Sequence, residues 1–198
     1  MRRLIHVPVV HAQADMGSLS DHVRALYIAH KGERAWRESR RAIACFWQEL
    51  DRKIAALDLA CDRLRLYQDG LPVCGREADI VRDLARAGGP NHRILLDLMG
   101  RGATVEGTED PTLLLQEYNL LKAGMAAPPP VAATLLDQRD RFIAGRIDAT
   151  LRPGETGMLF LGAHHRVVRM LPATIAVQRL DDARIEKRAA RDTQQSGG

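Results

Sequence analysis

Aromatic side chains, cysteines and long apolar runs are all scarce in this chain of 198 residues. Aromatic residues make up 4% of the sequence, and its basic residues are interspersed with acidic ones, so the dense basic and aromatic surface that binds nucleic acid is not expected. No apolar run approaches the roughly 20 residues that cross a bilayer, which argues against a membrane partner. The three cysteines, Cys45, Cys61 and Cys74, show neither metal-ligand nor redox spacing. A disulfide framework is therefore not expected, and a reducing cytoplasm is the expected location.

The sequence also lacks the patterns of a phosphate-binding loop and of a signal peptide. The glycine-containing loops at residues 70–75 and 88–92 do not match a phosphate-binding fingerprint, so no nucleotide cofactor is indicated. The first apolar stretch, residues 4–10, is interrupted by His6 and Pro8 and runs into polar residues with no small-residue cleavage site. This pattern is typical of a first strand and not of a signal peptide.

The remaining composition is that of an ordinary globular domain. Apolar residues make up 45% and charged residues 27% of the chain, with a formal net charge of +4. A chain of this length builds one hydrophobic core more readily than two. We therefore expect a single domain over residues 1–192 and a disordered polar tail over residues 193–198.

Short apolar segments alternate with longer helical patterns along the chain. Four of these segments have the character of buried strands, and a fifth is plausible: residues 4–10, 64–67, 103–105 and 158–161, with the fifth at 174–177. Strands separated by helices favour parallel pairing, with the helices covering the sheet. The sequence predicts an α/β fold: a single domain with a mainly parallel sheet of four to five strands and helices on both faces.

Three helical patterns are clear. Apolar residues spaced three and four apart over residues 36–61 predict one long amphipathic helix, which packs on the sheet or, as the alternative, forms the seam of a homodimer. Asp110 followed by Pro111 predicts the start of a second helix. The prolines at residues 128–130 form a stiff connector, and a third helical pattern resumes at Val131.

Every predicted strand runs into polar residues that are able to bind a ligand. The first strand leads to His11, the second to Asp69, the third to Glu109, and the fourth to the pair His164 and His165. Ligands of parallel α/β sheets bind beyond the carboxyl ends of the strands, so we expect these side chains to approach one another. Neighbouring residues of a strand point to opposite faces, so only one histidine of the pair is expected to face the site. The small residues before His164 slightly favour His164.

Imidazole and carboxylate groups are the usual ligands of divalent metals that activate water. The expected cofactor is thus a divalent cation such as Zn²⁺ or Mn²⁺ held by His11, Asp69 and His164 or His165. Acid–base chemistry without a metal needs the same residue types and remains open. In the helix that is expected from Val131, Arg139 or Arg141 is expected to bind an anion or carboxylate, or to pair with Glu106.

The order of these motifs resembles that of the TraB, pheromone-shutdown and erythromycin-esterase-like hydrolase superfamily. The similarity lies in an early strand ending in histidine, an acid after the next strand, the arginine-bearing segment 139–144 and the late strand 159–164. The resemblance implies catalytic or metal-ligand roles for His11, Asp69 and His164, and a substrate- or carboxylate-orienting role for Arg139 or Arg141. Residues 67–75 and 107–111 also resemble a group of prokaryotic proteins of unknown function.

These observations favour a metal-assisted hydrolase that cleaves an ester or amide bond in a small-molecule or peptide substrate. Its catalytic residues would be His11, Asp69, Glu109, Arg139 and Arg141. The alternative is a noncatalytic module in which the same strand-end groups bind a small polar ligand, or in which the long helix contacts a partner.

Overall fold

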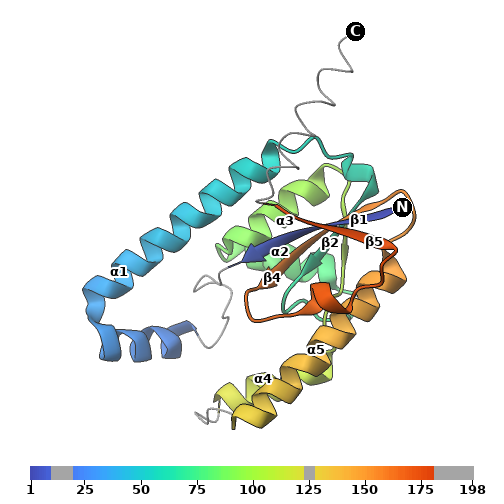
Figure 1. Ribbon diagram of the computed structural model, residues 1–198. Coiled ribbons are helices and arrows are strands. Elements are labelled where there is room, and N and C mark those ends of the chain that lie inside the picture. The colour runs from blue at the N-terminus through green and yellow to red at the C-terminus, as the bar shows by residue number, and fades with distance from the viewer. Residues whose placement is uncertain (10–19, 123–127, 181–198) are drawn as a thin grey trace.

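Five parallel strands form one sheet in the computed structural model, which describes residues 1–9, 20–122 and 128–180 (Figure 1). The strands are β1 (Arg2–Val9), β2 (Leu64–Gln68), β3 (Thr104–Glu106), β4 (Thr156–Gly162) and β5 (Ile175–Arg179). They lie in the order β3-β2-β4-β1-β5. The predicted α/β class and the five predicted strands are confirmed. His11 and the tail 193–198 lie outside the described residues.

Helices cover both faces of this sheet. They are α1 (Ser20–Ala55), α2 (Glu77–Arg86), α3 (Pro90–Gly100), α4 (Pro111–Lys122) and α5 (Pro129–Thr150), with short 3-10 turns η2 (Cys61–Arg63) and η3 (Val167–Met170). The end of α1 packs with α2 and α3 on one face, whereas α5 and η3 pack on the other. Within the described ranges, no helix combines the length and apolar character needed to cross a membrane.

The inner strands β1, β2 and β4 carry buried side chains on both faces, as strands of a covered parallel sheet do. In β4, Met158 and Phe160 belong to the core on the α1–α3 side, whereas Leu159 and Leu161 belong to the core on the α5 side. The same alternation runs through β1, where Leu4 faces α5 and its neighbour Ile5 faces the opposite core. This double burial explains why the strand segments are continuous apolar runs in the sequence.

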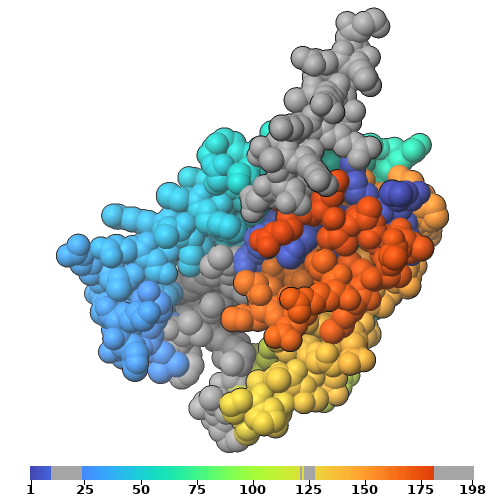
Figure 2. Space-filling view, in the orientation of Figure 1, coloured from blue at the N-terminus to red at the C-terminus, as the bar shows by residue number. Residues whose placement is uncertain are grey.

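Only the last part of α1 packs on the sheet. Trp47, Leu50 and Ile54 are buried there at helical spacing, whereas none of the described side chains over residues 24–46 is buried. The earlier part of the helix extends away from the sheet (Figures 1 and 2). Gly32 interrupts the helix with a φ of 81°, a conformation that glycine adopts readily. The predicted packing of the apolar stripe on the sheet thus holds for its C-terminal part.

Several predicted boundaries are wrong. The helix expected from Val131 begins at Pro129, inside the expected connector, because proline is tolerated in the first turn of a helix. The helix expected over residues 36–61 begins earlier, at Ser20. The long helix ends at Ala55 instead of continuing to Cys61, which instead starts η2. Residues 90–92, expected in a loop, form the first turn of α3, because a proline at the start of a helix loses no hydrogen bond. The predicted start of α4 is confirmed, since Asp110 Oδ1 accepts a hydrogen bond from Thr112 N at 2.7 Å.

The close packing of β4 against β1 yields a stability prediction. A Cβ atom at Gly157 would lie 2.6 Å from Leu4 Cδ1 and 3.2 Å from Tyr67 Cε2, both in fully buried side chains. We expect Gly157→Ala to lower the free energy of unfolding by about 1–3 kcal/mol, because a filled core has no room for a further methyl group.

Gly145→Ala in α5 is the matched control for this substitution. Gly145 is exposed, and apart from its chain neighbours and the backbone of its own helix no atom lies within 4 Å of the position that a Cβ atom would take there. The alanine should therefore raise the free energy of unfolding by roughly 0.5–1 kcal/mol through helix propensity. Urea unfolding of both variants measures the difference. A Gly157→Ala protein as stable as the wild type would contradict the packing described here.

Candidate functional site

The carboxyl ends of β2 and β4 are joined by Asp69. Its backbone N–H donates to Phe160 O at 2.9 Å, and its Oδ2 atom accepts a hydrogen bond from Gly162 N at 3.0 Å. The side chain is 5% exposed. Asp69 therefore extends the pairing of the two strands and holds a carboxylate at the point where both strands end.

Glu109 reaches the same point from the loop after β3. The backbone of this loop pairs with the loop after β2, since Glu109 N donates to Leu71 O at 3.0 Å and Val73 N donates to Glu109 O at 2.9 Å. Gly107 permits this approach, because a Cβ atom there would lie 2.6 Å from Val73 Cα. The Glu109 side chain is completely buried and lies within hydrogen-bonding reach of Gly70 N.

Arg139 projects from α5 between these carboxylates. Its Nε and Nη2 atoms donate to the two oxygens of Glu109 at 3.0 and 2.6 Å, and Nη2 also donates to Asp69 Oδ1 at 3.1 Å. Nη1 donates to both oxygens of Glu117 on α4 at 2.8 Å. All five N–H donors of the guanidinium are thus matched by carboxylate oxygens. Through these ion pairs, Arg139 on α5 connects the end of β2, the loop after β3 and α4.

His165 completes the cluster from the turn after β4. Its Nδ1 atom lies 2.5 Å from Asp140 Oδ1, and its Nε2 atom lies 3.5 Å from Asp69 Oδ2. Asp140 is itself held in place, because its Oδ2 atom accepts a hydrogen bond from Arg166 N at 2.7 Å. The imidazole ring therefore lies between two buried carboxylates, and its orientation is determined by Asp140.

The electrostatics of the cluster favour cations. Burial lowers the pKa of the His165 imidazole, but the bonds and charges of Asp69 and Asp140 outweigh burial and raise the pKa above its usual value. Burial likewise opposes the charge of Arg139, and the ion pairs with Glu109, Glu117 and Asp69 overcome it and raise the pKa further. Three buried carboxylates surround one guanidinium and one imidazole, so one negative charge remains among the buried groups even when His165 is protonated.

The structure brings together four of the side chains that the sequence placed at the site: Asp69, Glu109, Arg139 and His165. Ligand atoms of Asp69, Glu109 and His165 lie within 4.8 Å of one another. The position of His11 is not described. Its strand ends at the same edge as the cluster, because Val9 of β1 pairs with Gly162 of β4.

Two expectations are corrected. His164 is exposed and His165 faces the cluster, because the chain turns after β4 and His165 N donates to Gly162 O at 3.2 Å, so strand alternation no longer applies. Arg141 lies on the surface, where its Nε atom donates to Asp137 and its side chain is 73% exposed. It is not part of the cluster.

Glu106 also pairs differently from the prediction. Its partners are Arg65 on the neighbouring strand β2 and Arg146 on α5, the latter at 3.6 Å, and neither Arg139 nor Arg141.

Sequence reasoning missed Asp140 and Glu117. A signal for Asp140 is present in α5, where Arg139 and Asp140 occupy the apolar stripe formed by Leu135, Ile143 and Ala144 at helical spacing. Charged residues within such a stripe are buried and need partners. For Glu117, 41% exposed and located in a helix of ordinary amphipathic character, the sequence carries no comparable signal.

The buried ion pairs yield a prediction for Arg139→Met. This substitution leaves Glu109 and Asp69 buried without their cation, so we expect the free energy of unfolding to fall by about 3–5 kcal/mol. Arg141→Met, two residues away and exposed, should change it by less than about 0.5 kcal/mol. Urea unfolding tests both proteins, and two equally small effects would show that the cluster does not stabilise the fold.

The raised pKa of His165 predicts a pH dependence in the presence of a chelator. A histidine whose pKa is higher in the folded than in the unfolded protein contributes stability in full below the unfolded value of about 6.5, and this contribution is lost as the pH rises through the folded value. The stability advantage of wild type over His165→Gln should therefore shrink from pH 6 to pH 9.

His164→Gln, which removes the exposed imidazole next to the buried one, is the matched control for this titration. His6, whose pKa is lowered by burial and by Arg179, is present in all three proteins and cancels from these differences. Free energies of unfolding from urea titrations across the pH range provide the measurement, and an advantage that grows with pH would contradict the arrangement around His165.

Comparison with known proteins adds no relative: no family model, no curated protein and no solved structure matches the chain. The resemblance to the TraB-like hydrolase superfamily stays a prediction.

Proposed function

We propose that the chain is a metal-assisted hydrolase of ester or amide bonds, in which Asp69, Glu109 and His165 hold a divalent cation. The observation that carries the proposal is the convergence of two carboxylates and one imidazole, with ligand atoms within 4.8 Å of one another, at the carboxyl edge of a parallel sheet. The separation of 3.5 Å between His165 Nε2 and Asp69 Oδ2 is close to the roughly 3.4 Å between two ligands of a tetrahedral metal with bonds of about 2.1 Å.

The orientation of His165 also suits metal binding. In its neutral form the ring donates from Nδ1 to Asp140, which leaves the lone pair of Nε2 directed towards Asp69. A carboxylate on the far nitrogen of the ring is the usual support of a metal-bound histidine, because it determines the tautomer and raises the basicity of the ligand. The Asp140–His165 pair has this arrangement.

The charge of the cluster supports a divalent cation as well. With His165 neutral, the three buried carboxylates exceed the single charge of Arg139 by two. A divalent cation balances this excess, and a mixed imidazole and carboxylate donor set is suited to Zn²⁺ or Mn²⁺. Arg139 does not exclude the cation at Glu109, because Oε2 accepts a hydrogen bond from Arg139 Nε and a carboxylate oxygen has two lone pairs.

The chemistry such a cation supplies is polarisation of a substrate carbonyl and a lowered pKa of bound water. The chain's own residues would have two tasks. Asp140 holds the imidazole of His165 in one tautomer, and Arg139 holds the carboxylates of Asp69 and Glu109 in place through its hydrogen bonds. We further propose a small-molecule or peptide substrate and action in the cytoplasm, the latter supported by three free cysteines, of which Cys45 and Cys74 are exposed. The homodimer remains a prediction that rests on the unburied part of α1.

A noncatalytic ligand-binding or interaction module is the second candidate. It is favoured by the burial of the cluster, in which the side chains of Asp69, Glu109, Arg139, Asp140 and His165 are all at most 6% exposed. Charged side chains that are buried to this extent also occur in ion pairs that stabilise a fold without taking part in catalysis. Metal binding without turnover would favour this candidate.

The metal prediction is tested on the purified full chain by elemental analysis and by titration with Zn²⁺ and with Mn²⁺. We expect one cation per chain, and no binding by His165→Gln, since the substitution removes a ligand. His164→Gln is the matched control and should bind as wild type does, because this neighbouring ring is exposed. Asp140→Asn should weaken binding by about 10–100-fold, the usual effect of losing the group that orients a ligand.

A panel of ester and amide substrates, assayed with and without chelator, tests the reaction. We expect turnover that chelation and His165→Gln both abolish and that His164→Gln retains. A protein with neither metal nor turnover would refute the proposal. Turnover that a chelator does not reduce would instead indicate metal-free acid–base catalysis.

A further inference from the structure

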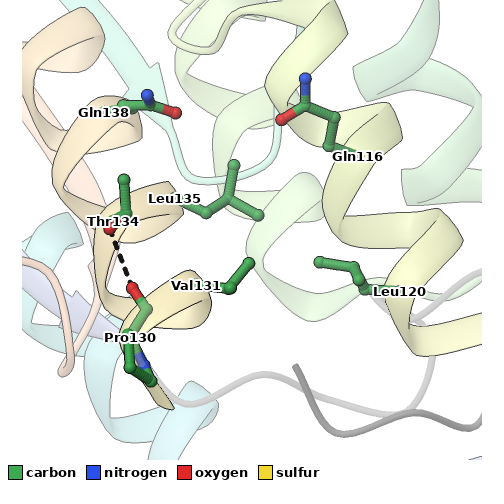
Figure 3. Close-up of a pocket in the computed structure, with 7 residues that line it drawn as sticks. All are labelled: Gln116, Leu120, Pro130, Val131, Thr134, Leu135 and Gln138. Atoms are coloured by element: carbon green, nitrogen blue, oxygen red, sulfur yellow. Dashed lines mark hydrogen bonds between the residues drawn. The ribbon is translucent and has the colours of Figure 1, made fainter. Parts of the chain in front are cut away.

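A cavity of about 290 Å³, largely open to solvent, lies between α4 and α5 (Figure 3). Leu120 of α4 and Val131 and Leu135 of α5 provide apolar walls. Gln116 and Gln138 add two carboxamides, which Figure 3 shows on opposite helices at one end of the cavity, with Pro130 at the other end. An apolar cavity with a few polar groups at one end is typical of a small-molecule site, and this volume lies near the lower limit of such sites.

The end of the cavity that carries the carboxamides points along the helices towards an ion pair. Arg139 follows Leu135 by one turn of α5, and Glu117 precedes Leu120 by one turn of α4, so each charged residue shares a helix face with a wall residue. The two charges meet across the helices, where Arg139 Nη1 donates to both oxygens of Glu117. Neither charged residue lines the cavity itself, and the ion pair lies about one helical turn beyond its walls.

Glu117 is the most weakly held carboxylate of the cluster. Glu109 is fully buried and takes two parallel bonds from Nε and Nη2 of Arg139, the strongest geometry for this pair. Glu117 takes bonds from a single nitrogen and is 41% exposed, so water competes for it and solvent screens its charge. An incoming carboxylate would replace Glu117 on Nη1 without disturbing the other partners of Arg139.

We propose that the cavity between α4 and α5 binds a small apolar carboxylic acid, whose carboxylate displaces Glu117 from Arg139 and whose tail lies against Leu120, Val131 and Leu135. Charge complementarity selects this ligand, because Nη1 donates to an anion while the cavity beyond it is mostly apolar. The exchange leaves the number of carboxylates paired with Arg139 unchanged, since one leaves as another arrives. Binding of the acid stands by itself, whereas its identification as part of the substrate, an ester or amide with a free carboxylate, rests on the proposed function.

Octanoate, at concentrations below micelle formation, is the probe, with octanol as the uncharged comparison. Isothermal titration in the presence of a chelator should show binding of octanoate and much weaker binding of octanol. Glu117→Gln should bind octanoate about tenfold more tightly than wild type, the equivalent of one charge-assisted hydrogen bond, because the competing carboxylate is gone. Glu38→Gln, an exposed glutamate paired with Arg34 on α1, is the matched control for net charge and should bind as wild type does.

Val131→Trp fills the cavity from a side chain that is 48% exposed, so the fold should tolerate it, and octanoate binding should fall at least about tenfold. Equal affinities in wild type, Glu117→Gln and Val131→Trp would overturn the proposal, and so would octanol that binds as tightly as octanoate. Because this titration contains no metal, octanoate binding by a chain that binds no cation refutes the proposed function alone. A chain that binds a cation but no octanoate refutes this inference alone.

Discussion

The burial of Arg139 is the constraint on which the carboxyl edge of this protein depends. A guanidinium keeps its charge at any ordinary pH and has five donors and no acceptor, so a side chain that is 6% exposed must meet carboxylates in a set geometry. Asp69, Glu109 and Glu117 supply them from three separate segments. Apolar packing holds α5 against the sheet without a preferred direction, whereas these bonds determine where along the sheet it comes to rest.

The same constraint creates the candidate site. One arginine does not neutralise the carboxylates gathered around it, and the remaining negative charge raises the pKa of His165. Burial makes such an excess costly unless a proton or a cation balances it. In the proposed function, this group of residues would hold a metal as well as stabilise the fold, and Asp140 would orient the imidazole of His165 towards the cation.

Access to this edge is uneven. Asp69, Glu109 and His165 are enclosed by the ends of β2 and β4 and by α5, whereas Glu117 lies at the solvent side of Arg139. The arginine therefore has two environments, a buried one that it shares with Asp69 and Glu109 and a half-exposed one that it shares with Glu117. This asymmetry links the proposed metal position to the cavity between α4 and α5 through a single side chain.

The sequence by itself determined the class of fold and the kind of residue at the strand ends. Doubly buried strands are continuous apolar runs, and Asp110 with Pro111 marks a helix start through local hydrogen bonding, so both are readable without tertiary contacts. The convergence of Asp69, Glu109 and a late histidine follows from parallel pairing alone. Only the tertiary structure decided that His165 and not His164 faces inward, that Arg139 and not Arg141 is buried, and that Asp140 and Glu117 belong to the cluster. These choices depend on the turn after β4 and on the rotation of α5 about its axis, and both are set by contacts between segments far apart in the chain, which local periodicity does not record.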